Sequence, residues 1–216
     1  MAHTLLIRRP FNYKFTRVTL SIILVNFVIF ALRFVSYDIF LILHNYCSLN
    51  AYMVRIHHMY WQFFTYMFMH YDISHIVCNM LGLLVFGLPL EKRIGSREFL
   101  LFYLTCGTLS GFFSYLVYLY TGQAQVFLLG ASGALYGVLF AYAVFFPRSM
   151  IFIWGIIPIP APVLVLIYTL IEVFSQFTGR NAGVAHLTHL FGFFAAWLYF
   201  IIRMGIRPIK VWKKTY

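Results

Sequence analysis

Six apolar stretches, each long enough to cross a lipid bilayer, dominate this chain of 216 residues. A helix needs about 20 mostly apolar residues to cross the hydrocarbon core of a bilayer. The span must be helical because the core holds no water to form hydrogen bonds with an open backbone. Only 10% of the residues are charged, against about 25% in a typical soluble domain. The sequence therefore predicts an all-α membrane protein built as one bundle. The expected spans are residues 18–37, 75–92, 97–120, 131–147, 150–176 and 184–203.

Two segments depart from a plain spanning helix. Residues 38–74 are rich in aromatic residues and histidine, and they are too apolar for a solvated loop. We expect them to fold back against the bundle in the outer leaflet, where protein can cover their backbone. In the fifth stretch, proline disturbs the helix at Pro158, Pro160 and Pro162, so only residues 163–176 have to be regular helix.

Positive charge follows the ends of the spans. The net charge of +11 would suggest nucleic-acid binding in a soluble protein, but membrane topology explains it better here. Thirteen of the sixteen Lys and Arg residues fall on the termini and on the second-to-third and fourth-to-fifth connections. The remaining three are Arg33, Arg55 and Arg180. Because six spans return the chain to its starting side, both termini are expected to be cytoplasmic.

The same pattern predicts the organisation of the chain. We expect residues 1–17 to be a cytoplasmic tail, 18–203 to be the six-helix domain, and 204–216 to be a basic cytoplasmic tail near lipid headgroups. No cleavable signal peptide is expected, since the first apolar run lacks a small-x-small cleavage site. The short tails, and a start that does not resemble a mitochondrial presequence, favour a bacterial inner membrane.

Ser132 has the surroundings of a buried nucleophile. Gly130, Ala131 and Gly133 let backbone and substrate approach its hydroxyl, and a helix that begins there leaves N–H groups free to hold an oxyanion. The alternative is a packing serine, because small residues at helical spacing let membrane helices approach closely. That small-residue stripe consists of Gly133, Gly137 and Ala141.

Two histidines lie in the last apolar stretch. A histidine inside a span is costly and is a functional candidate by default. Behind His189, the residues Gly192 and Ala196 form a smooth ridge that can pack against the small-residue stripe of the fourth span. That packing would bring His189 beside Ser132, so we favour His189 as the general base. His186 lies closer to the outer surface and suits a capping or water-contact role.

Polar residues at the start of the second span lie at the depth of Ser132. His75 and Asn79 share one helical face and offer N–H donors that suit a tetrahedral oxyanion. Hydrogen bonding between helices is the alternative, and a metal site is another, because other histidines lie nearby. These are His57, His58 and His70. A His-Glu-x-x-His motif is missing and the few acids are poorly placed, so we expect no metal.

No acid lies beside Ser132 or His189 in the sequence. Glu172 is on the fifth span and Asp72 is in the outer segment, so a Ser-His-Asp triad has no obvious third member. We therefore expect a two-residue dyad. Tyr136, one turn deeper than Ser132 on the same helical face, would hold His189 by packing instead of a carboxylate.

Several short motifs, taken in order, resemble the rhomboid family of intramembrane serine proteases. Each motif is weak alone, but the ordered set is highly specific and covers about residues 60–200. The resemblance implies a six-helix rhomboid bundle with a membrane-embedded hairpin between its first and second helices. The matching motifs are residues 61–65, Met69-His70, 75–79, 91–96, 130–137 and 185–192.

The resemblance also implies a role for each matching residue. Ser132 would be the nucleophile and His189 the general base, with His75, Asn79 and the Ser132 N–H as the oxyanion hole. Tyr136 would stack on the His189 ring. The other residues expected to support the site are Gly130, Ala131, His70 and Gly133.

Further roles implied by the resemblance lie outside the site. The fifth span and the loop before it would act as a lateral gate for substrate. Glu91 and Arg93 would belong to a structural polar cluster at the cytoplasmic end of the second span.

Two positions depart from the family pattern. Gln62 follows Trp61 where the family commonly has arginine, which implies a weaker anchor for the hairpin while catalysis survives. Thr188 replaces the usual small residue before the histidine, and His186 is an extra histidine. The family histidine precedes x-x-Gly, and His189-Leu-Phe-Gly192 fits that spacing.

The predicted function is cleavage of transmembrane segments in single-pass or polytopic membrane proteins, with lipid contacts, no cofactor and no nucleic-acid partner. One alternative is a catalytically inactive rhomboid-like chaperone that binds membrane helices, although such members generally lack the serine or the histidine. A transporter or channel that relays protons is another alternative. It would predict paired intramembrane acids or inverted repeats, and neither is visible.

Overall fold

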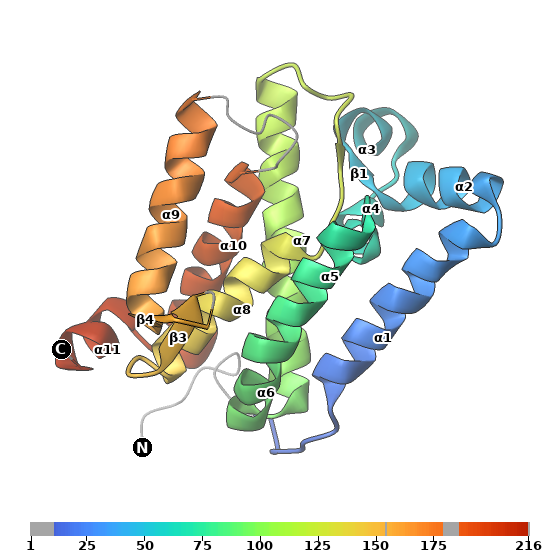
Figure 1. Ribbon diagram of the computed structural model, residues 1–216. Coiled ribbons are helices and arrows are strands. Elements are labelled where there is room, and N and C mark those ends of the chain that lie inside the picture. The colour runs from blue at the N-terminus through green and yellow to red at the C-terminus, as the bar shows by residue number, and fades with distance from the viewer. Residues whose placement is uncertain (1–10, 154, 179–185, 216) are drawn as a thin grey trace.

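The computed structural model is a bundle of apolar helices (Figure 1). It describes residues 11–153, 155–178 and 186–215. The beginning of the expected N-terminal tail, Arg180 and the first two residues of the expected last span lie outside the described residues.

Each expected span corresponds to one helical stretch, which confirms the all-α membrane bundle. Four stretches are long and apolar enough to cross a membrane, and two apolar helices are shorter, Val18–Phe34 and Ser132–Phe145. The helices of the bundle are α1 (Val18–Ala31), α5 (Ile73–Gly82), α6 (Leu88–Ile94), α7 (Ser96–Tyr120), α8 (Ser132–Phe145), α9 (Ala161–Thr178) and α10 (His186–Tyr199). Short turns extend α1 to Phe34, join α5 to α6 through Leu83–Gly87, and extend α10 to Met204.

The helix bounds correct the sequence prediction in places. The first helix ends at Phe34, three residues before the predicted end, and α8 is three residues shorter than the predicted fourth span. The second stretch runs further than predicted, over Ile73–Ile94. Apolar side chains continue past Phe34 and Phe145, whereas the second stretch continues through polar residues such as Ser74 and Arg93, so hydropathy alone places these boundaries a few residues away.

Apolar side chains cover the outside of the bundle. On α9, Leu166, Leu170 and Phe174 repeat every four residues and are 57%, 60% and 58% exposed. Such a continuous apolar face on a helix requires a lipid environment. The exposed residues thus agree with the hydropathy of the spans, and the protein is an integral membrane protein.

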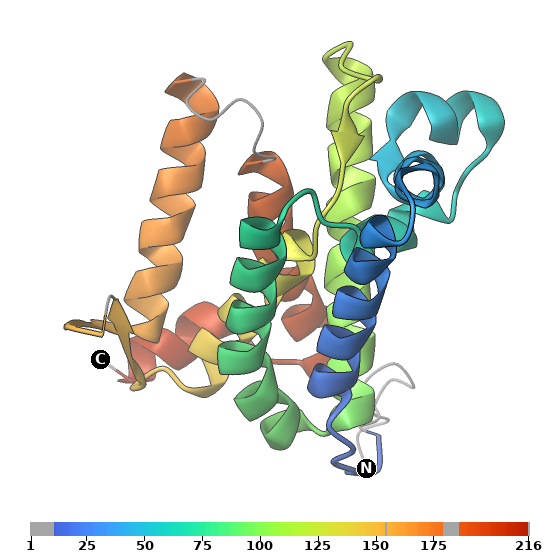
Figure 2. The same ribbon diagram turned by 45° about the vertical axis from the view of Figure 1, so that its right-hand side comes forward.

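The segment between α1 and α5 folds back against the bundle, as predicted. It contains α2 (Tyr37–Cys47), α3 (Ala51–His57) and α4 (Gln62–Thr65), and it packs beside α7 at the edge of the bundle opposite α9 (Figure 2). A short strand, β1 (Leu49–Asn50), pairs antiparallel with β2 (Phe127–Leu128) in the loop that leads to α8. This pairing links the hairpin to the segment that precedes Ser132.

Gln62 anchors this hairpin with side-chain hydrogen bonds. It is fully buried, its Oε1 accepts from the Asn50 N–H at 3.0 Å, and its Nε2 donates to the Asn45 carbonyl at 3.1 Å. The neighbouring Trp61 Nε1 donates to the Tyr46 carbonyl at 2.8 Å. Gln62 thus makes an anchor of its own where the resemblance implied a weaker one.

Replacing Gln62 by leucine is expected to destabilise the protein by about 1–3 kcal/mol, because the buried Asn50 N–H would lose its acceptor and the Asn45 carbonyl would lose its donor. Thermal unfolding in detergent measures the effect. Phe64→Leu, at a 42% exposed position of α4, is the matched control and should leave the melting temperature nearly unchanged. Equal melting temperatures for both variants and the parent would contradict the anchoring role.

Residues 150–153 and 157–160 correct the predicted fifth span. They form an antiparallel hairpin of β3 (Met150–Ile153) and β4 (Ile157–Pro160), and the helix begins only at Ala161. Pro158 and Pro160 favour extended conformations in the residues that precede them. Pro162 is tolerated because the first turn of a helix needs no N–H donor there. The expected regular helix over 163–176 is confirmed inside α9.

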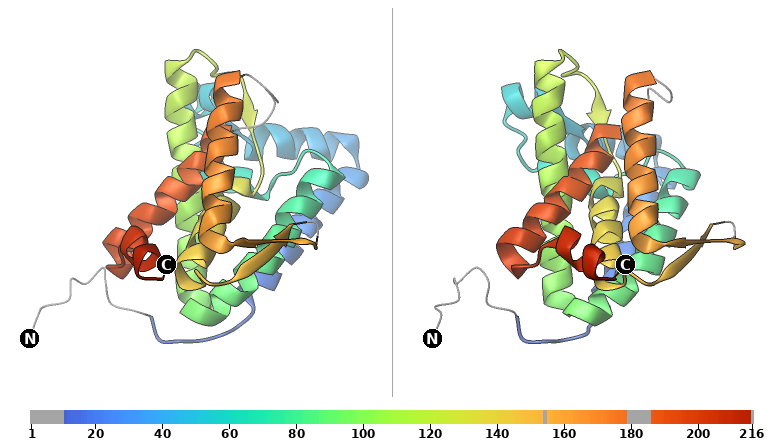
Figure 3. Two further views of the ribbon diagram at one scale, coloured as in Figure 1. Left: turned by 60° about the vertical axis from the view of Figure 1, so that its left-hand side comes forward. Right: turned by 90° about the vertical axis from the view of Figure 1, so that its left-hand side faces the viewer.

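The two described ends of the chain lie at the same end of the bundle (Figure 3). Lys14, before α1, accepts a hydrogen bond through its carbonyl from the Ser96 N–H at 2.7 Å. After α10, the residues expected to form a plain tail include a helix, α11 (Pro208–Thr215). Its Trp212 Nε1 donates to the Ala143 carbonyl at 2.9 Å, which fixes α11 beneath α8.

Glu91 connects α1 to the junction of α6 and α7. Its buried carboxylate accepts hydrogen bonds from the N–H groups of Val18 and Thr19 at 2.7 and 2.8 Å, and from the Ser96 hydroxyl. Arg93, expected in the same cluster, is instead exposed, with its guanidinium 5.9 Å from the centre of the Phe145 ring. The reason is helical spacing, because a residue two positions along a helix does not share the same face.

Candidate active site

Ser132 is the first residue of α8, directly after a turn that requires glycine. Gly130 has a φ of +120°, and a Cβ at this position would lie 2.6 Å from His75 Nε2. The Gly130 N–H donates to the Tyr66 carbonyl at 3.0 Å, which ties the turn to the hairpin. Because Ser132 opens the helix, its own N–H has no acceptor within α8.

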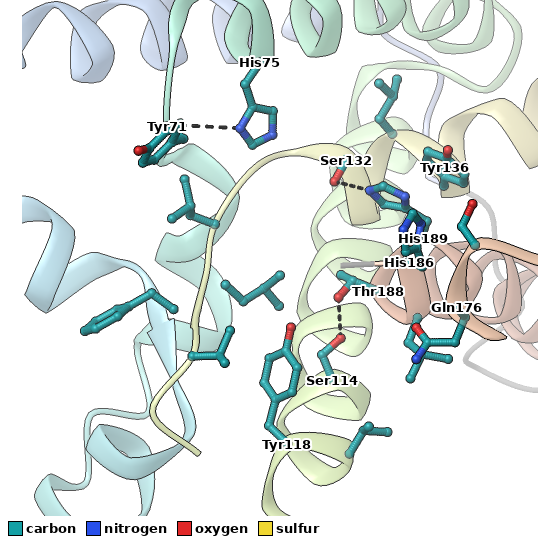
Figure 4. A pocket seen from close by; sticks show the side chains of 18 of the residues that line it. Tyr71, His75, Ser114, Tyr118, Ser132, Tyr136, Gln176, His186, Thr188 and His189 are labelled. Carbon is teal, nitrogen blue, oxygen red and sulfur yellow. Dashed lines mark hydrogen bonds between the residues drawn. The ribbon is translucent and has the colours of Figure 1, made fainter. Parts of the chain in front are cut away.

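Ser132 and His189 meet beside a close approach of α8 and α10. His189 Nε2 lies 2.8 Å from Ser132 Oγ. Below the pair, a Cβ on Gly192 would lie 2.2 Å from the Gly133 carbonyl oxygen, so the two backbones are almost in contact. The predicted packing of the Gly192 ridge against the small-residue stripe is therefore confirmed. Tyr136 stacks on the His189 ring, with centroids 4.2 Å apart and planes 12° from parallel (Figure 4).

A carboxylate reaches His189, and the expectation that none would do so is wrong. Glu172 Oε1, on α9, lies 2.8 Å from His189 Nδ1, on the far side of the ring from Ser132. The Tyr136 hydroxyl donates to the same oxygen. The sequence carried a signal for Glu172, because an acid inside a span is as unusual as a histidine and marks a functional candidate. Its distance from Ser132 and His189 along the chain hid the contact.

His186 also differs from its expected role near the outer surface. It is buried, and its Nδ1 lies 2.5 Å from Glu172 Oε2. Thr188, the unusual residue before His189, is buried against α7, with its hydroxyl 2.7 Å from Ser114 Oγ. A threonine is thus accommodated by a hydrogen bond, and His189 remains the histidine that contacts Ser132.

The proposed oxyanion donors come from the start of α5. Asp72 caps this helix by accepting from the His75 N–H at 2.8 Å, and Asn79 Nδ2 donates to the His75 carbonyl at 3.0 Å. His70 is buried behind them, with its ring 5.0 Å from that of His75 in an edge-on contact. Neither ring nitrogen of His70 has a hydrogen-bond partner among the described residues.

One cavity brings these groups together. It has a volume of about 900 Å³, and Ser132, His189, His75 and Asn79 all line it. Its other walls come from α7, α9 and the loop before α8. Within the described part of the chain, no three His, Cys, Asp or Glu side chains gather as ligands for a metal ion. A serine hydroxyl that is hydrogen-bonded to an imidazole and lies beside N–H donors is an arrangement suited to acyl transfer.

Comparison with known proteins identifies the family. Residues 57–205 match the sequence profile of the rhomboid domain. The chain belongs to the rhomboid family. This assignment agrees with the helical membrane bundle and with the order of the motifs along the chain.

The rhomboid relatives come from several kinds of organism. RHOMBOID-like protein 12, mitochondrial, of Arabidopsis thaliana is 30% identical over 139 residues, which are 58% of this chain and 41% of the relative. Presenilin-associated rhomboid-like protein A, mitochondrial, of Danio rerio is 36% identical over 93 residues, 43% of this chain and 23% of the relative.

The match to a bacterial relative covers fewer residues. Rhomboid protease GlpG of Salmonella choleraesuis is 36% identical over 52 residues, 24% of this chain and 19% of the relative. The chain thus spans less than half the length of each of these relatives. The rhomboid family includes serine proteases that act on membrane proteins, and it also includes members named only as rhomboid-like.

Proposed function

We propose that this chain is an intramembrane serine endopeptidase that cleaves transmembrane segments of other membrane proteins. The observation that carries the proposal is the 2.8 Å contact between Ser132 Oγ and His189 Nε2, which opens onto the large cavity. Ser132 acts as the nucleophile and His189 as the general base. The rhomboid family assignment supports the same chemistry.

The proposed reaction proceeds in two halves. His189, neutral at the start, takes the proton from Ser132 Oγ while the oxygen attacks the scissile carbonyl carbon. The tetrahedral intermediate collapses as His189 gives that proton to the leaving amine, which leaves an ester on Ser132. A water molecule, deprotonated by His189, then attacks the ester, and Ser132 recovers its proton as the acid product departs. The steps need no cofactor.

The oxyanion of the intermediate forms beside three groups. The Ser132 N–H, the His75 ring and the Asn79 amide are the donors in this proposal, and each is worth about 10²–10³ in rate at comparable sites. Gly130 keeps this space open because any side chain there would collide with His75. Four further residues support the positions of Ser132, His189 and His75 in this proposal, and they are Ala131, Gly133, Tyr136 and His70.

The substrate in this proposal is a transmembrane helix of a single-pass or polytopic protein. It enters between α5 and α9, which both contribute to the cavity wall, and it unwinds locally because a helix conceals its amide bonds. Substrates with small or helix-breaking residues near the cut are therefore preferred. The positive charge at the end of the bundle that holds both chain ends supports a cytoplasmic location for that end, in a bacterial inner membrane.

A fluorescent fluorophosphonate tests the proposal directly. An activated serine oxygen bonds to phosphorus and displaces fluoride, so the purified protein is expected to be labelled, with the label mapped to Ser132 by mass spectrometry. The same preparation should cleave a reporter protein that carries one transmembrane helix. A folded protein that binds the reporter helix but shows neither labelling nor cleavage would contradict the protease function and indicate a helix-binding protein instead.

A further inference from the structure

We infer that Glu172 is the positioning residue of His189, so that the site is a Ser-His-Glu array and not a two-residue dyad. The inference rests on the proposed roles of Ser132 and His189. It concerns a residue from α9, the helix at the edge of the bundle, whereas the serine and the histidine come from α8 and α10.

The contacts of the His189 ring specify its tautomer. To take a proton from Ser132, Nε2 must carry a lone pair, and the proton of the neutral ring must then be on Nδ1. Glu172 Oε1 lies 2.8 Å from Nδ1, where it accepts that proton in a hydrogen bond. The carboxylate also stabilises the imidazolium that forms when Nε2 accepts the Ser132 proton, while the Nδ1 proton stays on the ring.

The carboxylate is itself held in place from two helices. The Tyr136 hydroxyl of α8 donates to Oε1, and His186 Nδ1 of α10 lies 2.5 Å from Oε2. Glu172 is 4% exposed, and a carboxylate at such depth requires hydrogen-bond donors to remain ionised. These contacts give His186 a role, which is to fix the second carboxylate oxygen. They also give Tyr136 a second role besides stacking.

A purely structural role for Glu172 makes a different prediction. Glu98, a buried glutamate in the first turn of α7, offers the comparison. It accepts from the Tyr199 hydroxyl at 2.5 Å and from Arg203 Nη2 at 2.9 Å, so it also joins neighbouring elements of the bundle. Removing the charge at Glu98 should cost stability without changing the turnover of folded molecules. Removing it at Glu172 should change turnover itself.

The experiment compares Glu172→Gln, Glu172→Leu and Glu98→Gln, with rates expressed per folded molecule. Glu172→Gln keeps the size and an acceptor oxygen but removes the charge. Both Glu172 variants are expected to lower kcat by about 10²–10⁴-fold, as loss of the orienting carboxylate does in serine proteases, with KM nearly unchanged. Labelling by fluorophosphonate should slow in parallel.

Glu98→Gln is the control, and it should lower the melting temperature and keep kcat. Wild-type kcat in both folded Glu172 variants would overturn the inference.

A second measurement does not depend on hydrolysis. Nitrogen-15 NMR of protein labelled at histidine reports which ring nitrogen carries the proton, and His189→Gln identifies the resonances of His189. We expect the Nδ1–H form in the wild type and its loss in Glu172→Leu. An Nε2–H form in the wild type, or an unchanged spectrum in Glu172→Leu, would overturn the inference. Failure of the proposed function would appear separately, as absence of labelling and cleavage in the wild type.

Discussion

Alanine at Ser132 or at His189 is expected to reduce cleavage of a transmembrane reporter by about 10⁴–10⁶-fold, and the double variant should be no slower than either single variant. Neither residue is expected to support cleavage without the other, because the serine oxygen is a weak nucleophile until the imidazole removes its proton. Rates of reporter cleavage in proteoliposomes measure the effect. Ser132→Ala should leave the melting temperature nearly unchanged, since it removes only a hydroxyl that lines the cavity. His189→Ala also removes a partner of the buried Glu172 carboxylate, so its rate is expressed per folded molecule.

His186 provides the control for this prediction. It shares Glu172 with His189 but does not contact Ser132 in the described structure, so His186→Ala should retain fluorophosphonate labelling at a reduced rate. Labelling that survives in His189→Ala and disappears in His186→Ala would transfer the general base to His186. Losses that add up in the double variant would show that Ser132 and His189 do not act as one unit.

Gly192→Ala is expected to destabilise the bundle by about 1–3 kcal/mol or more, because an added methyl group would overlap a backbone atom that cannot rotate away. The new Cβ would lie 2.2 Å from the Gly133 carbonyl oxygen. The helices α8 and α10 would have to separate, and a displacement of about 1 Å between catalytic groups can cost about 100-fold in rate. Thermal unfolding and the cleavage rate of the folded fraction measure the two effects.

The matched control is Gly82→Ala on α5. Its added Cβ would meet Leu135 Cδ2 at 2.9 Å, which is the end of a flexible side chain that can move aside. This variant should keep both stability and cleavage close to the wild type. If Gly192→Ala behaved like Gly82→Ala, the close approach of α8 and α10 would not be needed to hold His189 beside Ser132.

Local patterns in the sequence were sufficient to predict much of this protein. The length and hydropathy of the apolar stretches predicted the helices, because a bilayer admits few alternatives to a helix in each span. The small residues Gly133 and Gly192 predicted which two helices touch, because only small side chains allow such an approach. With the ordered motifs, these patterns predict that Ser132 and His189 lie together.

The prolines near residue 160 determine only part of the local structure. Pro158, Pro160 and Pro162 predict that a regular helix is disturbed here, but they do not predict the β3–β4 hairpin. A proline pattern shows where a helix cannot form, and it does not show which extended segment will pair with which. That pairing depends on contacts between residues of the two strands, such as Ile151 opposite Ile159.

The contacts of single polar residues were decided by the tertiary structure. Gln62 bonds to backbone groups more than ten residues away, and Glu172 bonds to side chains of two other helices. A polar residue in an apolar span shows from the sequence that a partner must exist, since an unpaired one would be too costly. The identity of that partner depends on how each helix is rotated about its axis and how the helices cross. For this reason the sequence determined the helices, the family and the Ser132–His189 pair, while only the folded bundle showed that Glu172 lies against His189.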